Sequence, residues 1–216
     1  MILVQSRLLP LNGNSMTKCK ALIFLILSFG AIFTLSAQDS EYEQAYVNGK
    51  ELFRLKKYKL AMNALEPATT RASDNPYKEY ASFFYAVAAY RAGNIYQAKN
   101  MFLQIREFYP DWEKIEEVHF WLANVYFKEE RYAEALAQLQ MLDDNNLKQQ
   151  GSEMTLHFLK EVESLKKLKE LLNEFPENRD VARAIADKIN EQSMMTRDVE
   201  LLDSLMNTYN LKDFYQ

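Results

Sequence analysis

The sequence predicts an all-α protein, a solenoid in which antiparallel helix pairs stack side by side. The first observation is a repeated pattern: alanines recur at Ala61, Ala98 and Ala135, so that the period is 37 residues. The second is a scarcity of helix breakers after the first 37 residues, and the third is the helical spacing of apolar residues. Self-similarity at a fixed period is the mark of a stacked helical array.

Other positions repeat with these alanines. A small residue stands twelve positions before each alanine, a bulky apolar residue three before it, and a large apolar residue four after it. The small residues let the two helices of a pair approach closely, and the bulky ones fill the space beside them. In this order the residues are Gly49, Ala86 and Ala123, then Tyr58, Ile95 and Tyr132, then Leu65, Phe102 and Leu139.

From Gln38 onward the chain has only three glycines and four prolines. This composition predicts helix throughout, with Pro76 and Pro110 falling between helix pairs. Each helix is too short to be stable alone in water, so stacking must stabilise it. Residues 38–147 are therefore predicted to form three helix pairs, with helices at about 41–55, 58–70, 77–92, 95–108, 114–129 and 132–143.

The pattern degrades after Asp144. Residues 148–176 are predicted to be a degenerate fourth unit, in which the leucine spacing over 152–175 is compatible with one long helix or a shortened pair. Further helices are predicted at about 179–192 and 197–209, after the N-cap types Asn178 and Thr196. Residues 177–216 are thus predicted to be a capping helix pair, because a terminal element needs a polar outer face. An independent function of this part is the alternative.

Residues 1–37 have the pattern of a secretory signal peptide, with Met16 as an alternative start. Lys18 and Lys20 precede an uncharged apolar run over 21–37, and polar and acidic residues follow Ala37. Cleavage is expected after Ala37. The alternative is an uncleaved anchor, since the run has about the minimum length for spanning a bilayer. Membrane association is expected only through this leader if it is retained, and export to the periplasm or cell envelope is expected either way.

Without the leader's three basic residues, the chain has 23 basic and 30 acidic side chains, a net charge of −7. This balance argues against binding to duplex nucleic acid. The sole cysteine, Cys19, lies in the leader, and the sequence has no Asn-x-Ser/Thr acceptor. An exported chain without disulfides or glycosylation sites fits a bacterial envelope.

The repeated segments GKELFRLKKYKLAMNALEPA, AVAAYRAGNIYQAKNMFLQI and ANVYFKEERYAEALAQLQML resemble the tetratricopeptide repeat family over roughly residues 41–147. The units are three residues longer than the family's usual 34. The favoured early tryptophan is absent, with Ala45, Ser82 and His119 in its place. The resemblance implies a right-handed superhelix whose first helices line a concave groove that commonly holds peptides. It implies no reaction.

The first helices carry two sets of rings and a row of basic residues at the same 37-residue offset, and the resemblance places them in the groove. Such a surface would suit a peptide with apolar side chains and carboxylates. The alternative is that the rings belong to the core and the cations are solvated. The predicted site consists of Tyr46, Phe83 and Phe120, then Phe53, Tyr90 and Phe127, then Arg54, Arg91 and Lys128, and also Asn124.

No residue pattern predicts catalysis. His119 stands at an inter-helix position typical of a packed residue, and His157 has no second histidine or cysteine at metal-ligand spacing. Asp143 and Asp144 precede two asparagines, which is a capping and turn composition. We therefore predict no catalytic residue, no metal and no cofactor.

The leading hypothesis is a non-catalytic protein–protein interaction scaffold in the periplasm or cell envelope, which holds partner peptides in the groove. One alternative is an accessory or regulatory subunit of an envelope enzyme or secretion complex. Another is a self-assembling structural protein that forms a homo-oligomer through the helix at 152–175 and the last helices. The sequence predicts neither the partner's identity nor the cellular process.

Overall fold

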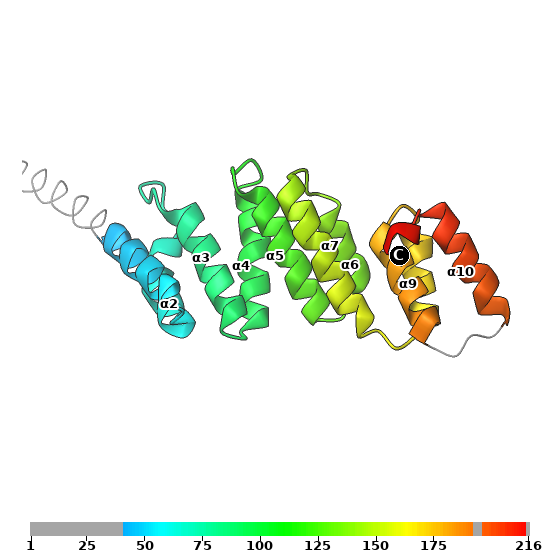
Figure 1. The fold of residues 1–216 in the computed structure, drawn as a ribbon. Helices are drawn as coiled ribbons and strands as arrows, with labels where there is room; N and C mark the ends of the chain where they lie inside the picture. Colours follow the sequence, from blue (N-terminus) through cyan, green and yellow to red (C-terminus); the bar gives the residue numbers. More distant parts are fainter. Residues whose placement is uncertain (1–40, 192–195, 215–216) are drawn as a thin grey trace, which may run out of the picture.

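The computed structural model describes residues 41–191 and 196–214, and these residues form helices and no strands. The predicted leader, residues 1–37, lies outside them. The helices stand side by side in one row, from the N-terminal helices in blue to the C-terminal helices in red (Figure 1). This arrangement confirms the predicted all-α fold of stacked helices.

The helices form three successive pairs and then a C-terminal part. Residues 41–54 form the first described helix. It is followed by α2 (Tyr58–Leu65), η1 (Glu66–Thr69), α3 (Lys78–Arg91), α4 (Ile95–Phe108), α5 (Ile115–Lys128), α6 (Tyr132–Leu139), α7 (Asn145–Lys160), α8 (Leu165–Glu174), α9 (Arg179–Glu191), α10 (Thr196–Thr208) and η2 (Lys212–Phe214).

The repeated small residues lie where two helices meet. Ala61, Ala98 and Ala135 have no exposed surface. A Cβ added to Gly49 would lie 2.3 Å from Cγ of Leu65 on the neighbouring helix. Because that leucine is fully buried, only glycine fits there without a shift of the core.

Two second helices end earlier than the sequence predicts. The helix predicted at 58–70 is α-helical only to Leu65, because Pro67 has no N–H to donate, and it continues as the 3₁₀ turn η1. The helix predicted at 132–143 ends at Leu139. After it, Leu142 turns into the core, where it is 2% exposed.

The segment left open as one helix or two contains two helices. The first, α7, begins already at Asn145, because the Asp144 side chain accepts a hydrogen bond from Leu147 N (2.8 Å). It ends at Lys160. Val162 is buried in the connection, and Ser164 caps α8 by accepting from Lys167 N (3.3 Å).

Helix α9 is the centre of the C-terminal part, since α7, α8 and α10 all pack against it. The predicted fourth unit and the predicted capping helices therefore share one core. Asn178 caps α9 as predicted, accepting from Val181 N (3.0 Å). Arg179 fastens the chain end by donating to the carbonyls of Tyr209 (3.0 Å) and Asn210 (2.6 Å). The buried face of α9 consists of Val181, Ala182, Ala184, Ile185, Ala186 and Ile189.

The turns inside the three pairs share one backbone conformation. Lys56, Gly93 and Glu130 are 37 residues apart and have φ angles of 58°, 83° and 57°. These left-handed residues end the first helix of each pair, where glycine is the favoured type. The turns lie along one edge of the row, and the linkers between pairs lie along the opposite edge (Figure 1).

Candidate functional site

Aromatic side chains of successive first helices contact each other across each joint between units. The helices involved are 41–54, α3, α5 and α7, and the ring centroids are 5.0–5.3 Å apart. Such ring pairs contribute about 0.5–1.5 kcal/mol beyond their burial. We call these three pairs the ring ladder: Phe53–Phe84, Tyr90–Trp121 and Phe127–Phe158.

Half of the ring ladder was missed by the sequence prediction. Phe84, Trp121 and Phe158 were not selected, although they too recur every 37 residues. The signal is the offset itself, which continues into α7 beyond the last repeated alanine. It marks α7 as the first helix of a further unit.

Phe127 is corrected by the structure. The sequence placed it in the groove, but its side chain is only 1% exposed. Its ring lies parallel to that of Phe158 and packs beside Tyr132. It is a core residue, because α7 packs on the face of α5 that carries it. The equivalent residues on the preceding first helices, Phe53 and Tyr90, are only half-buried.

The other predicted rings are half-buried and lie in contact with their neighbours. Tyr46 stacks on Tyr77 with a centroid distance of 5.1 Å. Phe83 lies against Trp112 (5.7 Å). Phe120 lies against Trp121 (6.1 Å), its neighbour on α5. Each of the three predicted rings thus has part of its surface in the array and part in solvent.

The three basic residues of the predicted row have different partners. Arg54 forms an ion pair with Glu51 (2.7 Å) on its own helix. The guanidinium of Arg91 lies 5.2 Å from the ring centre of Trp121, and the Lys128 ammonium lies 5.3 Å from that of Phe158. Arg91 and Lys128 are exposed, and the ion pairs between described residues involve other side chains.

Asn124 and Tyr90 complete the surface around Trp121. The Asn124 side chain donates to the carbonyl of Phe120 (3.0 Å) and leaves its own oxygen available. Burial raises the pKa of Tyr90, so its phenol stays neutral near pH 7. We define the Trp121 surface as Tyr90, Arg91, Phe120, Trp121, Asn124 and Lys128.

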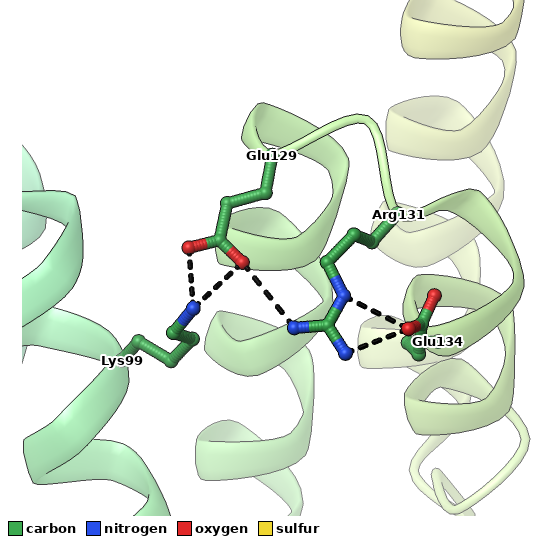
Figure 2. A network of polar contacts seen from close by, with 4 residues as sticks. All are labelled: Lys99, Glu129, Arg131 and Glu134. Carbon is green, nitrogen blue, oxygen red and sulfur yellow. Dashed lines mark hydrogen bonds and ion pairs between the residues drawn. The ribbon is translucent and has the colours of Figure 1, made fainter.

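A polar network on the turn edge has a structural role (Figure 2). Lys99 on α4 donates to both oxygens of Glu129 (2.6 and 2.9 Å), and Arg131 donates to Glu134 (2.6 and 2.8 Å), which lowers the pKa of the Glu134 carboxyl. Arg131 also lies 3.6 Å from Glu129. These charges are paired with one another. The contact between Lys99 and Glu129 joins the second unit to the third.

The described residues offer no arrangement that resembles a metal site, since they contain no group of three or more His, Cys, Asp or Glu side chains able to hold an ion. His119 is half-buried, with its Nδ1 3.0 Å from the amide oxygen of Gln138. This neighbour fits the predicted packing role. None of the helices in the described part of the chain is long and apolar enough to cross a membrane.

Fold and surface together define a helical-repeat protein that presents an aromatic and basic face. The family model described as "Tetratricopeptide repeat-like domain" matches residues 12–167, and the chain belongs to this family. The match confirms the resemblance inferred from the repeated segments. Proteins with such repeats generally serve as protein–protein interaction scaffolds and are generally non-catalytic. No curated protein matches the chain.

Proposed function

We propose that this protein is a non-catalytic scaffold of the periplasm or cell envelope that binds a partner peptide on the Trp121 surface. The observation that carries the proposal is the pairing of half-buried rings with exposed cations. Tyr90 and Trp121 form one ring pair, and Arg91 lies over the latter. At this pair an exposed arginine lies over a half-buried ring, and Asn124, three residues further along α5, uses its amide N–H and leaves its oxygen as an acceptor.

The chemistry of this surface indicates which kind of peptide segment it can bind. A half-buried tryptophan and tyrosine give a large contact area at a low entropic cost. Arg91 and Lys128 attract carboxylates, and the guanidinium can bind one with two parallel hydrogen bonds. The partner segment is therefore expected to carry an aliphatic or aromatic side chain next to aspartate or glutamate.

Charge reversal at the surface tests this proposal. Arg91→Glu combined with Lys128→Glu leaves the core intact, since both side chains are exposed. A pull-down from envelope extract is expected to lose its specific partners, and each lost contact should weaken binding by about fivefold or more. Phe127→Ala is unsuitable here, because this buried ring stabilises the fold.

The matched control reverses two lysines on the distant helix α8, Lys166→Glu and Lys169→Glu. It changes the net charge by the same amount and is expected to retain the partners. If the first double variant folds normally and recovers the same partners as wild type, the Trp121 surface is not the binding site.

The envelope location is part of the same proposal, and it is supported by the leader pattern of residues 1–37. Fractionation of the producing cells combined with N-terminal sequencing of the protein tests it. Recovery in the cytoplasm with residues 1–37 intact would contradict it. An N-terminus at Gln38 would establish cleavage, and an intact leader in the membrane fraction would establish an anchor.

A further inference from the structure

The first turn of the array exposes apolar and basic side chains together. Leu55 is 47% exposed and Leu60 is 54% exposed, and they flank Lys56, Lys57 and Lys59, which are also exposed. The ion pairs between described residues do not include these three lysines. The chain as a whole has a net charge of −4, so this turn is a local reversal of sign.

The second turn extends the same patch. Tyr96 in the first turn of α4 is 72% exposed, and it is the residue equivalent to Lys59 in the repeat. A shallow hollow of about 350 Å³ joins the two turns, since Ala92 of the second lines it beside the residues of the first. We name this patch the lysine edge: Leu55, Lys56, Lys57, Lys59, Leu60 and Tyr96.

The third turn differs in charge. Its residues equivalent to Leu55, Lys56 and Leu60 are Glu129, Glu130 and Glu134. Arg131, beside them, is held in the network of Figure 2. The turn edge is thus basic and apolar in the first unit, uncharged with an exposed tyrosine in the second, and acidic in the third. A contact made by this edge is confined to its N-terminal half.

We propose that the lysine edge docks the protein on a bilayer surface that contains anionic lipid. The lysines complement lipid phosphates and strengthen binding by about fivefold each. The exposed leucines and tyrosine are side chains that enter the headgroup region. The edge consists of turn tips at the border of the row (Figure 1), and such tips fit a flat surface rather than an extended peptide.

This docking surface is distinct from the predicted leader, and it shares no residue with the Trp121 surface. The helix over residues 41–54 is about 20 Å long, and the lysine edge lies at its far end from Glu41. An overall acidic protein is repelled by an anionic bilayer except where its surface is basic. Contact at this edge therefore fixes the orientation of the array on the membrane.

A dye attached to the edge tests the proposal in the full chain. Cys19→Ser removes the only native thiol, and Leu60→Cys provides one for the polarity-sensitive dye NBD. Vesicles contain either phosphatidylcholine alone or equal parts of phosphatidylcholine and phosphatidylglycerol. The dye is expected to brighten and shift to the blue with the mixed vesicles only, and high salt should reverse the change.

Two matched controls separate the edge from the rest of the chain. Glu134→Cys places the same dye at the equivalent position of the third unit, and no change is expected there. Lys56→Gln, Lys57→Gln and Lys59→Gln together should weaken the response at residue 60 by about a hundredfold. Lys166→Gln, Lys169→Gln and Lys212→Gln, on the C-terminal part, should leave it unchanged.

Three results would overturn the proposal. The first is an unchanged dye at residue 60, and the second is an equal response at residue 134. The third is a response to soluble polyglutamate that anionic vesicles do not produce, because the lysine edge would then be a docking surface for an acidic protein. Partner recovery in the Trp121 experiment is unaffected by any of these outcomes.

Discussion

The contacts that hold the three repeated units together differ from those that hold the C-terminal part together. Within residues 41–142, each joint between first helices has the same ring pair, and each turn has the same left-handed residue. In the C-terminal part, one central helix, α9, binds three others, and Arg179 ties the chain end by hydrogen bonds to carbonyls. Repetition allows an array to grow, whereas packing around one central helix does not repeat the unit, and the capping role predicted for residues 177–216 stays a prediction.

The joint between the two parts combines both kinds of contact. Phe127 on α5 stacks on Phe158 of α7, which repeats the ring ladder for the last time. At the opposite end of α5 and α7, the Glu116 carboxylate accepts hydrogen bonds from the backbone N–H groups of Asp143 and Asp144, both at 2.8 Å. Variants at this joint should therefore weaken the contact between the repeated units and the C-terminal part.

Phe127→Ala is expected to have the largest effect on this joint. Removing a fully buried ring costs about 3–5 kcal/mol in the free energy of unfolding. Phe53→Ala removes the equivalent ring at a half-buried position and should cost less. Urea unfolding followed by circular dichroism measures both. Equal losses would show that the last joint is no different from the first.

Substitution of the two glycines that lie within described helices, Gly49 and Gly151, tests how tightly each part is packed. Gly49→Ala places a Cβ 2.3 Å from buried Leu65, and the overpacking should cost about 1–3 kcal/mol. In Gly151→Ala the nearest atom is a terminal methyl of half-buried Leu139 at 3.0 Å, which can move aside more easily. Thermal unfolding of both variants should show the larger loss for the repeated unit. The reverse order would mean that α7 is the more tightly packed of the two.

Lowering the pH should weaken the joint through Glu116. The N–H groups of Asp144 and Asp143 stabilise its charged form and lower the pKa of its carboxyl from the usual 4.5. The contribution to stability is therefore complete above about pH 4.5 and is lost as the pH falls through the lower pKa of the folded state. Glu116→Gln should remove this part of the pH dependence, with a smaller effect than Gly49→Ala.

Hydrogen exchange at the amides of residues 143 and 144 measures this effect locally. Exchange should speed up in wild type as the acid transition is crossed, after correction for the intrinsic rate. In Glu116→Ala, which removes the acceptor, it should be fast already at neutral pH. Protection that is identical in the two proteins at neutral pH would exclude this role of Glu116.

The smallest expected effect is a gain at the turns. Glu130 has a left-handed backbone, so Glu130→Gly should raise the free energy of unfolding by about 0.5–1 kcal/mol. Gly93→Ala at the equivalent turn should lower it by a similar amount. Asn210 in the C-terminal part also has positive φ, but asparagine tolerates it, so Asn210→Gly should change little. Calorimetry of the three variants distinguishes these cases.

The fold was predictable because its signals are local and repeated. The alanine offset located three helix pairs, and Asn178 was recognised as an N-cap from its residue type alone. The ends of α2 and α6 were missed, because Pro67 and the turn at Leu142 act through a single hydrogen bond and a single buried side chain. The apolar spacing over 152–175 runs through the break between α7 and α8, so it could not show that Ser164 caps a separate helix.

The sequence by itself determined that small and large residues alternate at a fixed period, and this periodicity requires helices to stack in a row. Only the tertiary structure decided which rings remain at the surface. Phe53, Tyr90 and Phe127 are equivalent by sequence, yet only the last is fully buried. The physical reason is that exposure depends on how closely neighbouring helices cover a residue, and α7 packs on α5 with Phe158 stacked on Phe127.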